Sequence, residues 1–226
     1  VLEGINLTLK KDTVTALVGI SGSGKTTLLK LLLGFYSPAK GDIRAGDMNI
    51  QMMSPDLWRG QCGVVMQDGY IFSDSIARNI ALGEHEIKTD QLMYAAKMAC
   101  MDDFIDQLPL GYNTVIGQEG LTLSGGEEQR ILIARAVYKN PSFLFLDEGT
   151  SALDANNERR IMDNMHLVFR GKTVLIVAHR LSTVKNADQI IVLDKGKIVE
   201  EGKHNALIAK KGHYFNLVRN QLELGN

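Results

Sequence analysis

Cysteine is scarce in this sequence, with two among 226 residues, and its scarcity narrows the possible classes of protein. Cys62 and Cys100 lie far apart and form no CxxC pair. A disulfide framework or a structural zinc site would need more cysteines at closer spacing. We therefore expect a reducing, cytosolic environment and a buried Cys62.

The chain also lacks a surplus of positive charge. It has 25 basic and 26 acidic residues and a formal net charge of −1. A protein that holds a nucleic-acid backbone needs a basic surface, so nucleic acid is not expected among its partners. The hydrophobic share of 45% and the charged share of 23% are typical of a folded protein.

Long apolar runs are missing as well. The longest, such as residues 173–178, have the length of strands, whereas a membrane-spanning helix needs about 20 apolar residues. The sequence begins Val-Leu-Glu-Gly, without an initiator Met or a signal peptide. We expect residues 1–226 to form a single domain taken from a longer protein.

Strand-like and helix-like segments alternate along the chain, which predicts an α/β fold with a mostly parallel sheet. A Leu-rich helix is expected at residues 26–33, and Ser54-Pro55 is typical of the start of a short helix. The pattern becomes helical from about residue 76 to residue 140 and again from residue 204. Strands are expected at residues 14–18, 63–66, 143–146, 173–178 and 189–193, the last in a hairpin with 197–199.

A glycine-rich loop follows the first strand. Residues 19–26 read Gly-Ile-Ser-Gly-Ser-Gly-Lys-Thr, which fits the phosphate-binding pattern G-x-x-x-x-G-K-[ST]. Backbone N–H groups in such a loop point at phosphate oxygens, with a helix dipole behind them. Lys25 is expected on the β- and γ-phosphates and Thr26 on Mg²⁺. The predicted ATP-binding residues are Gly19, Ser21, Gly22, Ser23, Gly24, Lys25, Thr26 and Thr27.

Two adjacent acids end the apolar segment at residues 143–146. Asp147 and Glu148 would lie beside the phosphate loop, because open α/β sheets bind ligands at the carboxyl ends of their strands. Asp147 is expected to hold Mg²⁺ through water, and Glu148 to orient and deprotonate the attacking water. The alternative is that both acids simply begin a solvated loop.

The segment Leu123-Ser124-Gly125-Gly126-Glu127, followed by Glu128-Gln129-Arg130, resembles the signature motif of ATP-binding cassette (ABC) ATPases. Together with the phosphate loop and the two acids, the resemblance covers essentially the whole chain. It implies a phosphate-loop NTPase core with a mostly parallel sheet, an N-terminal antiparallel β part and a helical insertion. The implied division is a core at 1–70 and 141–203, a helical subdomain at about 76–140 and C-terminal helices at 204–226.

The resemblance also assigns roles to further residues. Gln67 matches the Q-loop glutamine, which would act in catalysis, ATP binding and metal binding beside Thr26 and Asp147. His179 matches the switch histidine on the γ-phosphate, and Lys25 and Glu148 complete the catalytic set. Residues 151–154 match the D-loop: Ser151, Ala152, Leu153 and Asp154. Taken alone, Gln67 and His179 could each be an ordinary polar residue at the end of a strand.

Ser124, Gly125, Gly126 and Glu127 have two compatible interpretations. By themselves they predict a helix whose first turn is capped by serine. In the family they face ATP held by the opposite subunit, so the resemblance implies a head-to-tail pair of domains, either identical or sister subunits. Hydrolysis would then release the pair, with ATP and Mg²⁺ as cofactors.

Three stretches resemble exporters within the family: residues 67–80, the X-loop-like residues 114–120, and residues 179–188. They imply a transmembrane partner domain outside this chain and a place at the cytoplasmic face of a membrane. The alternative is a soluble ATP-switched clamp on a ribosome or chromosome. The missing coiled-coil insertion, the net charge and the exporter-like X-loop all disfavour that alternative.

Some positions depart from the family pattern. Glu127 stands where Gln is typical, and we expect its carboxylate to point towards its own helix because it would repel a phosphate. Gln118 and Glu119 replace the more common acidic and basic pair of the X-loop, and Gly149 replaces a usual Ala. The family's adenine-stacking aromatic would precede Val1, so a version extended upstream is expected to bind ATP more tightly.

Overall fold

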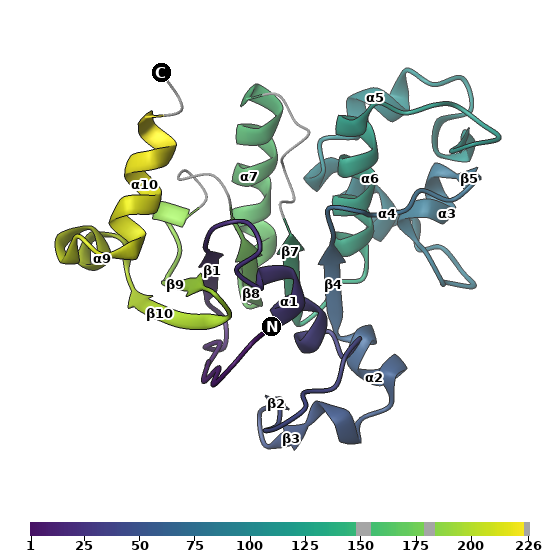
Figure 1. Ribbon diagram of the computed structural model, residues 1–226. Coiled ribbons are helices and arrows are strands. Elements are labelled where there is room, and N and C mark those ends of the chain that lie inside the picture. Colours follow the sequence, from purple (N-terminus) through teal and green to yellow (C-terminus); the bar gives the residue numbers. More distant parts are fainter. Residues whose placement is uncertain (148–154, 179–183, 224–226) are drawn as a thin grey trace.

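The computed structural model of the protein describes residues 1–147, 155–178 and 184–223 (Figure 1). Its centre is a six-stranded sheet in the order β10-β9-β1-β8-β7-β4. Neighbours from β9 to β4 pair in parallel, and β10 pairs with β9 in the antiparallel direction. The predicted α/β fold is confirmed. The strands are β1 (Val14–Val18), β4 (Cys62–Val65), β7 (Phe143–Asp147), β8 (Thr173–Val177), β9 (Gln189–Asp194) and β10 (Lys197–Gly202).

Helices cover both faces of this sheet because its inner strands, β9, β1, β8 and β7, are buried on both sides. Leu17 and Phe145 face the layer of α1 (Lys25–Leu32) and α2 (Pro55–Gly60). Ala16 and Leu144, each one residue away along its strand, face the layer of α6 (Gly125–Tyr138) and α7 (Ala155–Phe169). The result is a three-layer core with the sheet in the middle (Figure 1).

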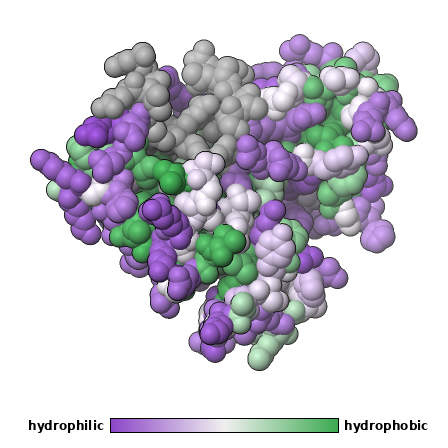
Figure 2. All heavy atoms as spheres, in the orientation of Figure 1, coloured by the Kyte–Doolittle hydropathy of each residue, from purple (hydrophilic) through white to green (hydrophobic). Residues whose placement is uncertain are grey.

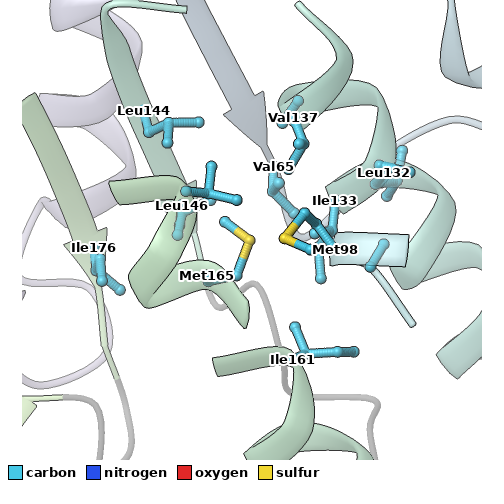
Figure 3. Packing of buried hydrophobic residues seen from close by; sticks show 14 of the residues in the cluster. Val65, Met98, Leu132, Ile133, Val137, Leu144, Leu146, Ile161, Met165 and Ile176 are labelled. Atoms are coloured by element: carbon cyan, nitrogen blue, oxygen red, sulfur yellow. The ribbon is translucent and has the colours of Figure 1, made fainter. Parts of the chain in front are cut away.

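The second layer joins the sheet to a helical part of the chain. Figure 3 shows Met98 of α4 (Thr89–Met98) and Met165 of α7 pointing into the space beside Val65 and Leu146. Met98 is 7% exposed and Met165 is 2% exposed. Flexible thioether side chains suit such a junction, because they fill the irregular gaps where helices meet a sheet at different angles.

The predicted change to helical structure between residues 76 and 140 is confirmed. This region contains α3 (Ile76–Ile80), α4, α5 (Asp102–Asp106) and α6, together with the short helix η2 (Gly111–Asn113). One detail was not expected: β5 (Asp74–Ser75) and β6 (Val115–Ile116) form an antiparallel pair at its edge. The exact division of the chain into core, helical subdomain and C-terminal helices stays a prediction.

The expected antiparallel part is present as β2 (Arg44–Ala45) paired with β3 (Met48–Asn49), followed by the short helix η1 (Ile50–Met52). Residues 1–13 lie outside the sheet, with a bend at Gly4 and a turn at residues 11–12. The side chains of Leu2, Ile5, Leu7 and Leu9 pack against the α1 layer. The backbone N–H of Glu3 donates to Gly196 O (3.0 Å), which ties this segment to the β9–β10 hairpin.

Local sequence signals agree with the structure. Ser54 Oγ accepts from Leu57 N (3.1 Å), and Pro55 occupies the first turn of α2, as predicted. In the predicted hairpin, Lys195 and Gly196 both have positive φ (45° and 78°), the conformation of a tight two-residue turn. Cys62 is buried as expected, and its burial raises the pKa of the thiol to about 12, so it is unreactive near neutral pH.

The C-terminal region forms two helices, α9 (His204–Lys210) and α10 (His213–Glu223). They are separated at Lys211, whose φ of 52° cannot continue a right-handed helix. In the part of the chain that the structure describes, no helix has the length and apolar content needed to span a bilayer.

Candidate functional site

The glycine-rich loop lies between the carboxyl end of β1 and the start of α1. Gly24 has φ 107°, a conformation that residues with a side chain rarely adopt. At Gly19 an added Cβ would collide with the carbonyl oxygen of Leu193 on β9. Both glycines are therefore required by the path of the loop.

Polar groups converge inside this loop. Lys25 is 6% exposed, and its Nζ donates to Gly19 O (2.8 Å) and Ile20 O (3.0 Å). Ser23 is 2% exposed, and its Oγ has no hydrogen-bond partner among the described residues. A buried hydroxyl without a partner costs free energy unless a ligand satisfies it. The loop therefore fits an anion with several acceptor oxygens.

The start of α1 also suits an anion. Gly24 stands at its N-cap without a side chain that could cap it, and no acidic residue occupies its first turn. The first N–H groups of a helix carry a partial positive charge. A phosphate at this position would complete the hydrogen bonds of the first turn, where Thr26 and Thr27 also lie.

A hydroxyl and a carboxylate meet beside the loop. Thr26 Oγ1 donates to Asp147 Oδ2 (3.2 Å), and Asp147 is the last residue of β7 and 4% exposed. Two hard oxygen ligands on adjacent elements are what Mg²⁺ takes from a protein when phosphates and water supply the rest. Among the described residues there is no group of three or more His, Cys, Asp and Glu side chains that could hold a metal unaided.

Of the remaining predicted site residues, the structure describes Gln67 and does not describe Glu148, His179 or the D-loop. Gln67 is exposed in a turn two residues beyond β4, at the same edge of the sheet as Asp147, because β4 and β7 run parallel. Asp147 and Ala178, which directly precede Glu148 and His179, are both placed at this edge.

The signature residues form the N-terminus of α6. Ser124 is its N-cap, and Gly125 and Gly126 begin the helix, as predicted. Glu127 Oε2 accepts from Ser124 N (2.7 Å) and from Ser124 Oγ (2.8 Å), so the expectation that its carboxylate turns to its own helix is confirmed. We had not predicted this reciprocal capping box, although the Ser-x-x-Glu spacing signals it.

Two further residues were missed by sequence reasoning. Asn79 is fully buried; its side chain accepts from Phe72 N (2.9 Å) and donates to Phe72 O (2.9 Å), Asp74 O (3.2 Å) and Ser75 O (3.1 Å). Arg135 of α6 donates to Asn79 O (2.8 Å) and Tyr70 O (3.0 Å), and burial lowers its pKa. Together they fasten the segment after Gln67 to the signature helix.

Comparisons with known proteins agree with this geometry. HlyB, the alpha-hemolysin translocation ATP-binding protein of Escherichia coli, is 50% identical over 210 residues, which cover 93% of this chain and 30% of HlyB. The leukotoxin translocation ATP-binding protein LktB of Mannheimia glucosida is 48% identical over 224 residues, covering 99% of this chain and 32% of LktB. The chain thus spans about a third of these relatives' length.

A solved structure leads to the same family. A bacterial Atm1-family ABC exporter with ATP bound matches with a TM-score of 0.93 and 40% identity, covering 97% of this chain and 38% of the exporter chain. The family model described as ABC transporter matches residues 2–151, which is most of the sequence. The chain therefore belongs to the ABC transporter family.

Proposed function

We propose that this chain is the ATP-hydrolysing motor domain of an ABC exporter. The observation that carries the proposal is the convergence of Lys25, Thr26 and Asp147 around an anion-binding loop. Residues of this kind can hold a nucleotide triphosphate and its metal ion in one place. The names of the relatives, two translocation ATP-binding proteins and an exporter, favour this function over a soluble clamp.

ATP and Mg²⁺ are the proposed cofactors. Ser23 and the backbone N–H groups of the loop would bind phosphate oxygens, and Lys25 would leave the loop carbonyls for the β- and γ-phosphates. Thr26, Asp147 and Gln67 would hold Mg²⁺, whose positive charge offsets the charge that develops on the phosphates during transfer.

Hydrolysis needs a base and a sensor of the γ-phosphate. Glu148 would take a proton from the attacking water, because it directly follows Asp147 at the metal-binding edge of the sheet. His179 would contact the γ-phosphate from the neighbouring strand end after Ala178. The D-loop, residues 151–154, would lie beside the second nucleotide-binding domain.

A single chain presents two separate halves of a site. The phosphate loop and Thr26 lie at the start of α1, whereas Ser124 lies at the start of α6. We propose that two such domains pair head to tail, so that each ATP is held by the loop of one domain and the signature residues of the other. The pair would close on ATP and open after hydrolysis, which turns a chemical step into movement.

The surface around β5 and β6 is the proposed contact with a transmembrane domain at the cytoplasmic face of a membrane. The β5–β6 pair brings the segment after Gln67 next to the X-loop-like residues 114–120. Tyr70, Phe72, Val115 and Leu121 are all exposed there. Figure 2 shows hydrophobic side chains among hydrophilic ones over the helical part of the chain. Exposed apolar groups of this kind are typical of docking surfaces.

Substitution of the proposed base tests the function. Glu148→Gln is expected to lower the rate of ATP hydrolysis by at least about 10²–10⁴-fold, the usual contribution of a positioned base. Phosphate release in the presence of Mg²⁺ measures the rate. The exposed Glu86 offers a control of the same chemistry, and Glu86→Gln should leave the rate unchanged.

Light scattering of the Glu148→Gln protein tests the pairing of domains. A dimer that forms with ATP and not without it supports the shared nucleotide site. A Glu148→Gln protein that keeps most of its hydrolysis rate would remove Glu148 from the role of base, and a monomer under both conditions would argue against the homodimer.

A further inference from the structure

The N-terminus of α6 is capped by the side chain of Glu127, which lies in its own first turn. A single carboxylate oxygen, Glu127 Oε2, accepts from both Ser124 N (2.7 Å) and Ser124 Oγ (2.8 Å). In return, Glu127 N donates to Ser124 Oγ (3.3 Å). Hydrogen bonds to an ionised acceptor are stronger than neutral ones, so the carboxylate holds the serine side chain in one orientation.

The two helix starts of the proposed nucleotide site therefore differ. At α1, Gly24 provides no capping side chain and the first turn has no acidic residue. At α6, the first turn contains Glu127 and Glu128, and the Glu127 carboxylate lies where the partial positive charge of the helix would attract an external anion. A phosphate approaching α6 meets a negative charge already in place.

The Glu127 carboxylate and an incoming phosphate would compete for the hydrogen of the Ser124 hydroxyl. A serine hydroxyl has one hydrogen, and in this structure it points to Glu127 Oε2. Ser124 Oγ cannot donate to a phosphate oxygen while it donates to Glu127. A nucleotide held by a second domain can take this hydrogen bond only if the Glu127 carboxylate releases it.

We propose that Glu127 is a positioning residue that keeps the Ser124 hydroxyl turned away from the partner's nucleotide and so sets the ATP concentration at which two domains pair. This inference rests on the proposed function, because it needs the nucleotide site shared between two domains. The carboxylate stabilises the separate chain and weakens the closed pair. One side chain thus has opposite effects on folding and on pairing.

Opposite effects of Glu127 on folding stability and on pairing would distinguish the proposed role from a purely structural one. If Glu127 only caps α6, its replacement should lower stability and leave pairing unchanged or weaker. If it also holds Ser124 back, replacement by glutamine should lower stability and strengthen pairing. Glutamine keeps the shape and can still accept a hydrogen bond, but it removes the charge.

The experiment compares Glu127→Gln with Glu128→Gln, each combined with Glu148→Gln so that ATP persists. Glu128 is exposed in the same turn of α6, so its replacement removes the same charge without touching the contact to Ser124. Light scattering over a range of ATP concentrations gives the half-maximal concentration for dimer formation. Thermal unfolding gives the stability, and nucleotide titration of dilute monomer gives the affinity of the phosphate loop.

We expect Glu127→Gln to lower the melting temperature and to lower the half-maximal ATP concentration about fivefold, the equivalent of one hydrogen bond. Glu128→Gln should change the melting temperature and the half-maximal ATP concentration by much less. The affinity of the monomer for ATP should be the same in all of these proteins. Equal ATP requirements for the two variants, weaker pairing in Glu127→Gln, or a change in monomer affinity would each overturn the inference. If no protein forms an ATP-dependent dimer, the proposed homodimer is wrong and the inference falls with it, whereas the phosphate loop is tested separately by nucleotide titration.

Discussion

Replacing Lys25 with alanine is expected to lower the rate of ATP hydrolysis by about 10²–10³-fold, the usual cost of losing one group that stabilises charge in a transition state. The Lys25 ammonium is buried at the loop and held by Gly19 O and Ile20 O. A buried ammonium interacts more strongly with phosphate oxygens than an exposed one does, because water screens its charge less. Steady-state phosphate release separates the effect on kcat from the effect on KM.

Lys30 provides the matched control for this experiment. It lies in the last turn of the same helix, away from the loop. Lys30→Ala should therefore leave kcat within a factor of two or so of the unaltered chain, since substitutions away from a functional site have small effects. A Lys25→Ala protein that retains a tenth or more of its hydrolysis rate would contradict the role assigned to this residue.

Asn79→Ala is expected to lower the free energy of unfolding by at least about 2 kcal/mol. The change removes a fully buried amide that is bonded to Phe72, Asp74 and Ser75. Each buried backbone group left without a partner costs about 1–3 kcal/mol, and some of these groups will recover a bond to water. The corresponding fall in melting temperature is about 4–8 °C for a chain of this size.

Exposed Asn113 in the same helical region is the control, and Asn113→Ala should shift the melting temperature by no more than about 2 °C. Hydrogen exchange supplies a local readout, because the amides of Phe72 and its neighbours should exchange faster in Asn79→Ala. Equal melting temperatures and equal exchange in the two variants would show that Asn79 does not hold this segment.

Features that depend on residues close together in the sequence could be predicted from it. The phosphate loop, Ser54 before Pro55 and the Lys195-Gly196 turn are each specified within a few residues, and all were predictable from local backbone preferences. The capping box of Ser124 and Glu127 was equally local, and its spacing could have been recognised.

Contacts between distant residues were not predictable in this way. Arg135 donates to the backbone of Tyr70, 65 positions away, and nothing near either residue indicates that bond. The β5–β6 pair joins two strands of two residues each, too short to show an alternating pattern. Such contacts depend on how whole elements pack, which a single sequence reveals only through motifs.

The helix α6 connects the signature residues to the segment after Gln67. Its first residues, Gly125 and Gly126, lie at the proposed nucleotide interface, and Arg135, roughly 15 Å further along its axis, is fastened to Asn79 and Tyr70. An α-helix resists compression along its axis because every turn is hydrogen-bonded to the next. Under the proposed pairing, a displacement of the first turn of α6 would therefore also move the backbone of Tyr70, which Arg135 holds at the far end of the helix.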